Sequence, residues 1–391
     1  MKNILVVLGT RPEAIKLAPV ILELSKYPDL FKVIVCNTEQ QKELSNQALS
    51  FFGIKADINL DAMSHNQSLA GLQSTVLTKL NEVFLNNEIH ATIVQGDTMS
   101  VFCGGLASFY NKIPVFHVEA GLRSGNIFEP FPEEAIRCMV SKITDLHFAP
   151  TNDAAEVLVK EGIVRDKVIS TGNTVIDALM CLSQKAMYDA KIYLENQKIV
   201  LDDKITLITV HRRENHGERL DNILKAITTI VERKPDHKFI LPVHPNPNVK
   251  DKVHQALGKF DNVHLLPPLD YPVLVTLMRN TKLVLTDSGG IQEEAPSFGN
   301  PVLVMRYKTE RNEGVAAGFA KLVGADTDMI VKESLNILDK NKAATRLDGS
   351  KNPYGNGMAS KTIVAQIKKF LQIDGELIER EEIREVAVAA E

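Results

Sequence analysis

The chain has 391 residues, more than one ordinary hydrophobic core accommodates, so two domains are expected. Its net charge of −4 disfavours nucleic-acid binders, which carry a basic excess, and no apolar run approaches the roughly 20 residues that span a bilayer. The four cysteines are scattered, and the N-terminus lacks the long apolar stretch of a signal peptide. We therefore expect a cytoplasmic protein without a zinc site or disulfide framework, which binds neither membrane nor nucleic acid.

Short apolar runs rich in β-branched residues alternate with longer segments of helical period. Within most runs the apolar residues are consecutive, which is typical of strands covered on both faces in a parallel sheet. The first series comprises residues 4–8, 32–36, 91–94, 114–118, 146–149 and 167–170, and the second comprises residues 205–210, 238–243, 263–266, 283–286 and 302–305. A charged stretch at 188–204 separates the two series and is a candidate inter-domain region. The pattern predicts an α/β protein with two doubly wound lobes and a cleft between them.

The end of the chain departs from this alternation. Residues 362–371 carry an apolar stripe of helical period, whereas residues 374–391 are rich in Glu. The acidic segment is typical of a solvated helix or a frayed tail.

Polar residues follow directly after five of the predicted strands. In open parallel sheets, ligands bind beyond the carboxyl ends of the strands, where the strand order reverses. The polar segments are residues 9–16, 95–98, 119–123, 211–214 and 287–294. We therefore expect the functional site among them.

The best candidate for an anion site is the turn formed by Ser288, Gly289 and Gly290. Glycine lets a ligand approach the backbone, and free N–H groups at the start of a helix attract phosphate. Glu294, one helical turn further on, could accept hydrogen bonds from ribose hydroxyls. The alternative is an ordinary turn in which Ser288 caps the helix.

Other side chains could complete a diphosphate site. Arg11, Lys16 and Arg311 offer cations near predicted strand ends, although any one of them could be an ordinary surface charge. His211, followed by Arg212, is also placed at a strand end for phosphate contact.

Common cofactor motifs are missing from the sequence. The first strand-to-helix turn has no Gly-x-Gly-x-x-Gly, which disfavours nicotinamide and flavin dinucleotides, and no Gly-x-x-x-x-Gly-Lys-Ser/Thr occurs. The histidines lack the i, i+4 spacing of a helical metal pair. We expect neither a redox cofactor nor a metal.

Asp97, Glu119 and Glu133 are the candidate acid–base groups. Asp97 and Glu119 follow buried-type strands, which places them at the rim of the cleft, where crowded carboxylates raise one another's pKa. The structural alternatives are a turn-forming role for Asp97 and stabilisation of a helix dipole by Glu133.

Eight segments, spread over nearly the whole chain, together resemble the non-hydrolysing UDP-N-acetylglucosamine 2-epimerases. They are residues 9–16 (GTRPEAIK), 96–98 (GDT), 117–123 (HVEAGLR), 132–134 (PEE), 171–177 (TGNTVID), 211–214 (HRRE), 286–296 (TDSGGIQEEAP) and 352–355 (NPYG). The resemblance implies a glycosyltransferase-B-like fold of two Rossmann-like lobes. The first would span residues 1–172, completed by a C-terminal helix at about 358–373, and the second, UDP-binding lobe would span residues 173–357.

The resemblance also implies an activity. A homodimer would interconvert UDP-N-acetylglucosamine and UDP-N-acetylmannosamine through 2-acetamidoglucal, with no metal and no nicotinamide, and would supply bacterial surface polysaccharide synthesis. The alternatives are a hydrolysing relative that releases UDP and N-acetylmannosamine, a glycosyltransferase of the same fold, and a nucleotide-sugar sensor.

The resemblance further implies a role for each candidate residue. The acid–base carboxylates would be Asp97, Glu119 and Glu133, and Glu294 would contact the ribose. The departing diphosphate would be held by Arg11, Lys16, His211, Ser288, Gly289, Gly290 and Arg311. Gln40, Arg212 and His244 match a regulatory pocket in which many bacterial members bind a second UDP-N-acetylglucosamine.

Overall fold

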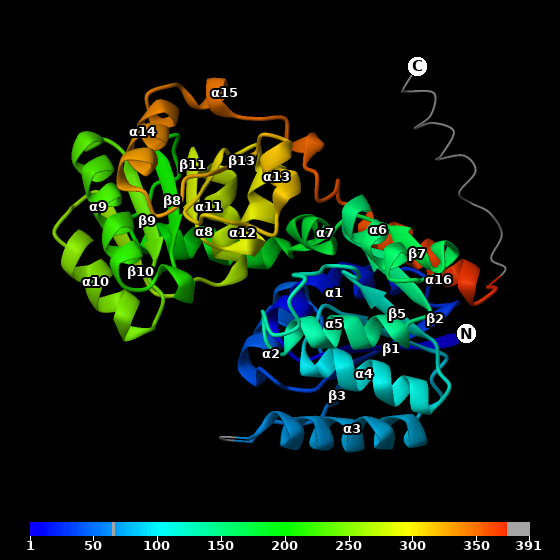
Figure 1. The fold of residues 1–391 in the computed structure, drawn as a ribbon. Coiled ribbons are helices and arrows are strands. Elements are labelled where there is room, and N and C mark those ends of the chain that lie inside the picture. Colours follow the sequence, from blue (N-terminus) through cyan, green and yellow to red (C-terminus); the bar gives the residue numbers. More distant parts are fainter. Residues whose placement is uncertain (65–66, 374–391) are drawn as a thin grey trace.

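Two parallel sheets organise the protein, one in each of two lobes (Figure 1). The computed structural model describes residues 1–64 and 67–373, so the acidic segment at 374–391 lies outside the described residues. No helix in those two described ranges is long and apolar enough to cross a membrane.

The first sheet has the strand order β3-β2-β1-β4-β5-β6-β7. Its strands are β1 (Lys2–Leu8), β2 (Phe31–Asn37), β3 (Ile58–Asn59), β4 (Ala91–Gln95), β5 (Val115–Val118), β6 (Leu146–Ala149) and β7 (Val168–Ser170). The helices of this lobe are α1 (Arg11–Leu24), α2 (Lys42–Phe51), α3 (Leu69–Asn86), α4 (Met99–Tyr110), α5 (Glu133–Lys142) and α6 (Asn152–Lys160).

The second sheet has the strand order β10-β9-β8-β11-β12-β13. Its strands are β8 (Ile205–Thr209), β9 (Lys238–Pro242), β10 (Val263–Leu266), β11 (Leu283–Thr286), β12 (Val302–Val304) and β13 (Ala320–Leu322). The helices that follow the first lobe are α7 (Thr174–Cys181), α8 (Gln184–Asn196), α9 (Glu218–Arg233), α10 (Pro247–Leu257), α11 (Tyr271–Asn280), α12 (Gly289–Glu294), α13 (Asn312–Ala316), α14 (Thr327–Leu338), α15 (Lys342–Thr345) and α16 (Ala359–Phe370).

Each predicted apolar run forms a strand, and the predicted α/β class is confirmed. The central strand β1 shows why these runs are continuously apolar. Ile4, Val6 and Leu8 enter one hydrophobic cluster, whereas Leu5 and Val7 enter another on the opposite face. Because helices cover both faces, the buried positions from Ile4 to Leu8 leave no place for a polar side chain, and the polar Lys2 and Asn3 occupy the partly exposed start of the strand.

The chain crosses between the lobes at two adjacent places. Helix α7 contacts α1 and α12, and α8 then packs on α11, so the charged stretch at 188–204 forms the second half of α8 and the connection to β8. Helix α16 returns to the first lobe and packs on α1 and α7 (Figure 1). The two crossings touch where the Asn173 backbone N–H donates to the Tyr354 carbonyl at 2.7 Å.

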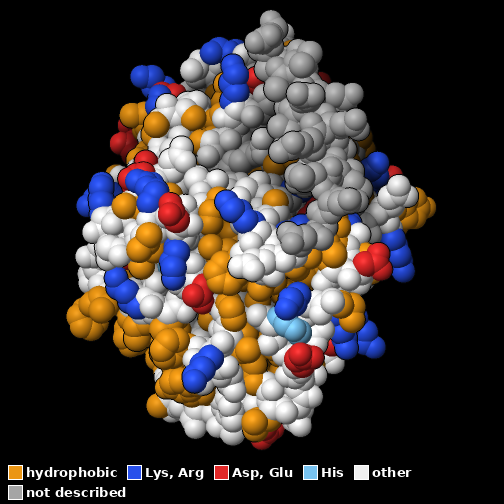
Figure 2. Space-filling model, turned by 90° about the vertical axis from the view of Figure 1, so that its right-hand side faces the viewer, with side chains coloured by type: hydrophobic (Ala, Val, Ile, Leu, Met, Phe, Trp, Pro, Cys, Tyr) orange, Lys and Arg blue, Asp and Glu red, His pale blue; other side chains and the backbone are white. Residues whose placement is uncertain are grey.

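Asp177 fastens the returning helix. Its carboxylate accepts hydrogen bonds from the Ser360 backbone N–H at 2.7 Å and the Ser360 hydroxyl at 2.6 Å, at the beginning of α16. At the other end of α16, the Phe370 ring lies edge-on to Phe116 with centroids 5.2 Å apart. On the face shown in Figure 2, Lys and Arg side chains are interspersed with Asp and Glu, as the near balance of charges in the sequence suggests.

Candidate active site

The strand order reverses between β1 and β4 in the first sheet and between β8 and β11 in the second. The turns that follow these strands line two adjoining cavities. The larger, of about 790 Å³, lies between the lobes, and its lining includes Arg11, His211, Ser288, Gly290 and Glu294. The smaller, of about 170 Å³, is lined mainly by the first lobe, including Gln95, Asp97, Thr98, Glu119 and Arg137. Lys16 and Arg311 line both cavities and therefore mark their junction.

An ionic network occupies this junction. The Lys16 ammonium bonds to Glu119 and lies 3.8 Å from Glu293 Oε2. Arg311 reaches Glu293 Oε1 with Nε and Nη2, each at 2.9 Å. The Asn173 side-chain amide donates to Glu119 at 3.3 Å and to Glu293 at 3.2 Å. Two cations and an amide, drawn from both lobes, thus hold two buried carboxylates.

The network controls the ionisation of Glu119. Burial alone would raise the pKa of Glu119, but Lys16, Arg311 and Arg137 outweigh burial and hold that pKa below its ordinary value. Burial would likewise lower the pKa of Lys16, but Glu119 and Glu293 raise it. Both groups are therefore charged at neutral pH.

The backbone at Glu119 is strained. Glu119 directly follows β5 and has φ +62°, in the left-handed region that side chains other than glycine seldom adopt. Gln95 at the end of β4 donates a hydrogen bond to its second carboxylate oxygen. Such strain persists where the surroundings fix a side chain for function.

Asp97 is held by a separate cation. Its carboxylate lies 2.5 Å from Arg137 Nη2, and Arg137 Nη1 lies 3.0 Å from Glu134. Glu133 begins α5 one helical turn before Arg137, and its Oε2 is buried without a hydrogen-bond partner among the described residues. The structure therefore brings Asp97 and Glu119 to the smaller cavity, whereas Glu133 is not among its described lining residues.

Glu13 joins the two turns of the first lobe. One carboxylate oxygen accepts from the Gly9 and Thr10 backbone N–H groups at 2.6 and 2.8 Å, and the other accepts from the Thr98 hydroxyl. Burial raises the pKa of Glu13 to about 7 although these hydrogen bonds lower it. Glu13 thereby fixes the turn that carries Arg11 relative to the turn that carries Asp97.

In the second lobe, Asp287 organises the turn after β8. Its buried carboxylate accepts from the backbone N–H groups of His211 at 3.1 Å and Arg212 at 2.9 Å, and from the Asn215 amide at 3.0 Å. His211 Nδ1 lies 3.2 Å from the same carboxylate. Burial lowers the pKa of His211. Burial therefore favours the neutral ring, Asp287 opposes that shift, and the carboxylate beside Nδ1 favours the tautomer with its proton on that nitrogen.

The Ser288 turn has no side-chain cap. Ser288 precedes α12, yet its hydroxyl makes no capping hydrogen bond. A Cβ on Gly289 would lie 3.2 Å from Arg311 Cζ and 3.4 Å from Arg212 Nη2. Two guanidinium groups therefore flank a turn that lines the cleft, an arrangement that attracts anions.

Glu294 is the least satisfied carboxylate of the cleft. It is 7% exposed, and its Oε2 has no hydrogen-bond partner among the described residues. Burial, together with repulsion from Glu293, raises the pKa of Glu294 to about 8. It is placed to pair with a hydroxyl-bearing ligand.

Residues expected in a regulatory pocket lie on both lobes. The His244 ring stacks on His211 with centroids 6.2 Å apart, and Arg212 lies against the Ser288 turn. Gln40 accepts from the Ser100 hydroxyl at 3.0 Å, in the first lobe beside Gly9. Arg212 and His244 thus lie near His211 in the second lobe, whereas Gln40 lies in the first lobe.

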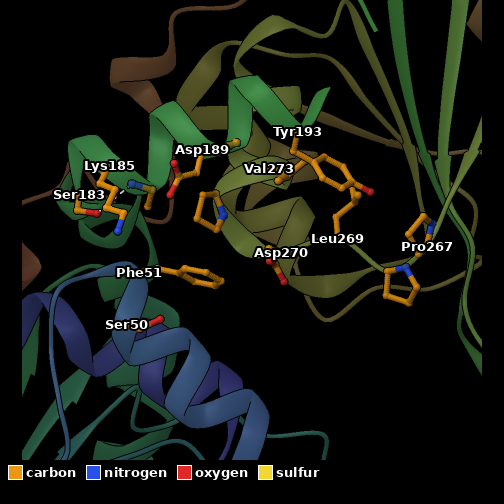
Figure 3. A pocket seen from close by; sticks show the side chains of 14 residues that line it. Ser50, Phe51, Ser183, Lys185, Asp189, Tyr193, Pro267, Leu269, Asp270 and Val273 are labelled. Carbon is orange, nitrogen blue, oxygen red and sulfur yellow. Dashed lines mark hydrogen bonds between the residues drawn. The ribbon is translucent and has the colours of Figure 1, made fainter. Parts of the chain in front are cut away.

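The segment 267–270 separates the cleft from a third cavity of about 580 Å³, shown in Figure 3. Pro268 and Leu269 line both spaces. The first lobe holds this segment at two points, since Arg11 Nη2 donates to the Leu269 carbonyl at 3.1 Å and the Gln47 amide donates to Asp270 at 2.9 Å. These contacts join the lobes beside the larger cavity.

Sequence reasoning did not assign a role to several side chains of the site: Glu13, Arg137, Asn173, Asp287 and Glu293. Asp287 directly follows β11, and Arg137 is four residues after Glu133, so position in the pattern could have indicated both. Across residues 1–64 and 67–373, no three His, Cys, Asp or Glu side chains are grouped in a way that would hold a metal ion.

Two facing parallel sheets with a cation-rich cleft between them define a glycosyltransferase-B-like protein. A glycosyltransferase of kitacinnamycin shares this fold at a TM-score of 0.62, with 12% identity over 93% of this chain and 98% of that chain.

The comparisons then identify the family. The family model described as UDP-N-acetylglucosamine 2-epimerase matches residues 23–368. The chain is 46% identical over 370 residues to the UDP-N-acetylglucosamine 2-epimerase of Neisseria meningitidis, covering 94% of this chain and 99% of that protein. It is 44% identical over 365 residues to the Bacillus subtilis protein of that name, covering 93% and 94%. The crystal structure of the Neisseria meningitidis UDP-GlcNAc 2-epimerase bound to UDP-GlcNAc matches at a TM-score of 0.82 and 44% identity, over 94% of this chain and all of that one. The chain belongs to the UDP-N-acetylglucosamine 2-epimerase family.

Proposed function

We propose that this protein interconverts UDP-N-acetylglucosamine and UDP-N-acetylmannosamine by eliminating UDP and adding it back, without hydrolysis. The observation that carries the proposal is the position of Lys16 and Arg311. Both lie between a cavity large enough for a nucleotide and a small cavity lined by carboxylates. A diphosphate bound at this junction directs its sugar toward Asp97 and Glu119.

The elimination follows from the chemistry of the sugar. The proton at C2 has no neighbouring carbonyl, so its direct removal is very hard. When the C1–O bond breaks, its electron pair leaves with UDP and C1 becomes oxocarbenium-like, which acidifies C2–H. Loss of that proton to a carboxylate forms the C1=C2 bond of 2-acetamidoglucal. Reprotonation from the opposite face and return of UDP invert C2.

The candidate residues divide between these tasks. Asp97, Glu119 and Glu133 are the proposed acid–base groups. Arg11, Lys16, His211, Arg311 and the Ser288-Gly289-Gly290 turn stabilise the departing diphosphate, and Glu294 accepts from the ribose.

Contacts between the lobes support a reaction without hydrolysis. Arg11 and Gln47 of the first lobe bind the 267–270 segment, and Lys16 reaches toward Glu293 of the second. Lobes held in this way retain the glucal and exclude water, which would otherwise consume it.

We further propose a cytoplasmic homodimer that supplies bacterial surface polysaccharide synthesis, as the family resemblance implies. The proposed division is a first lobe at 1–172 with the helix at about 358–373, and a UDP-binding lobe at 173–357. Gln40, Arg212 and His244 are the proposed contacts of a second, activating nucleotide sugar.

The test is an NMR assay with UDP-N-acetylglucosamine as sole substrate in heavy water. We expect deuterium at C2 and formation of UDP-N-acetylmannosamine. Free N-acetylmannosamine that accumulates in step with UDP would instead establish the hydrolysing reaction. Binding without isotope exchange would indicate a sensor, or a glycosyltransferase that lacks its acceptor.

A further inference from the structure

The cations at the junction of the two cavities already have carboxylate partners. Lys16 pairs with Glu119 and approaches Glu293, and Arg311 pairs with Glu293 through two nitrogens. Glu293 is 2% exposed, so bulk water screens its charge little. Glu293 therefore occupies the cations that a diphosphate would use as counter-ions.

A bound diphosphate must compete with these carboxylates. Its oxygens can approach Lys16 and Arg311 at the junction only by sharing or replacing the existing ion pairs. Glu119 then loses part of the attraction that keeps it ionised, and it becomes a better acceptor for a proton.

The strength of this competition changes during the reaction. Free UDP ends in a terminal phosphate group whose second ionisation adds negative charge near neutral pH, whereas in the nucleotide sugar this phosphate is esterified by the sugar and lacks that ionisation. Breaking the C1–O bond therefore draws the cations toward UDP. When the C1–O bond re-forms, Lys16 and Arg311 bind the diphosphate less strongly. The two cations can then pair again with the buried carboxylates Glu119 and Glu293.

We propose that Glu293 is a positioning residue that holds Lys16 and Arg311 in competition with the diphosphate, so that UDP departs and also returns. This role rests on the proposed epimerase function. It is distinct from a structural ion pair, because a structural pair strengthens the site, whereas a competing carboxylate weakens UDP binding.

Asn173 makes the competition reversible. Its amide donates to both Glu119 and Glu293, which lie on different lobes, and keeps the two carboxylates beside the cations. The elements packed around Glu293 contribute Lys16 from α1, Arg311 from the segment after β12, and Glu294 from α12 itself. Of these three groups, Lys16 and Arg311 carry the charge opposite to that of Glu293, and both are cations that a diphosphate would use.

The experiment measures UDP affinity by calorimetry with the full chain. Glu293→Gln keeps the size of the side chain and removes the competing charge, so UDP should bind about tenfold more tightly. Glu293→Asp keeps a buried negative charge and withdraws it by one carbon, so UDP should bind about threefold more tightly. The matched control is Glu156→Gln on α6, which removes a carboxylate from an exposed ion pair with Arg165 and should leave the affinity unchanged.

A second readout follows the reaction by NMR in heavy water. In Glu293→Gln, tighter retention of UDP should slow deuterium incorporation at C2 about tenfold and allow 2-acetamidoglucal to accumulate. UDP affinity that is unchanged or weaker in both Glu293 variants would overturn the proposal, as would tighter binding with undiminished exchange. Absence of exchange in the unaltered protein would instead refute the epimerase function, which the affinity measurement does not require.

Discussion

Replacing Glu294 with Gln removes a titratable group from the cleft and preserves its shape. Burial, with repulsion from Glu293, raises the pKa of Glu294 from 4.5 to about 8. The folded protein therefore keeps a proton that the unfolded chain releases between these two pH values. This contribution to stability is fully present below pH 4.5 and is lost as the pH rises toward 8, by about 1.4 kcal/mol per pH unit.

The variant has no such proton to lose. Between pH 5 and pH 8, its free energy of unfolding should therefore rise by about 3 to 4 kcal/mol relative to that of the unaltered protein. Urea unfolding can be followed by far-UV circular dichroism, since the chain has no tryptophan. Other groups titrate in this range, but they are common to both proteins and cancel in the difference.

Glu310→Gln is the matched control. Burial would raise the pKa of Glu310, but Arg306 and neighbouring donors outweigh it and lower the pKa to about 2, so Glu310 stays ionised throughout the measured range. The difference between this variant and the unaltered protein should be independent of pH. A Glu294→Gln difference that is equally flat would refute the reasoning. If Glu294 accepts from the ribose, the stabilised variant should also bind UDP about tenfold more weakly.

Three further substitutions test the site and the fold. Asp97→Asn should abolish C2 exchange while leaving UDP affinity within about tenfold, and loss of both together would contradict a role in proton transfer. Asp177→Ala should destabilise the protein by about 3 kcal/mol and expose α16 to limited proteolysis, because two donors of Ser360 lose their acceptor; an unchanged digestion pattern would count against this. Gly121→Ala should lower the melting temperature more than Gly125→Ala does. Both glycines have positive φ, but only at Gly121 would a Cβ meet a backbone oxygen, Ala154 O, at 2.2 Å.

The strands of both sheets could be predicted because most of them are runs of consecutive apolar residues. Strands such as β1 and β11 are buried on both faces, so their sequence admits few polar residues and stands out from the helices around them. The edge strands β3 and β13 were not predicted, because they have two and three residues and partly exposed side chains. Runs this short carry too little pattern to be distinguished from a loop.

That several of the candidate residues line one cavity could be predicted from the sequence, but the pairings among their side chains could not. The rule that ligands bind at the carboxyl ends of parallel strands correctly gathered Lys16, Asp97 and Glu119 around one cavity. The partners Asn173 and Glu293 are 120 residues apart and meet only because the lobes pack together. A local sequence pattern cannot contain such a contact.

The paired crossings at Asn173 and Tyr354 limit how the two halves of the molecule can move. Both connections between the halves meet at this one place, so the halves would pivot there and stay in register beside it. Asn173 itself bonds to Glu119 and Glu293, so these carboxylates lie beside the pivot and would move little relative to each other as the halves open and close. Each closure would bring Lys16 and Arg311 back to Glu119 and Glu293 in the same arrangement.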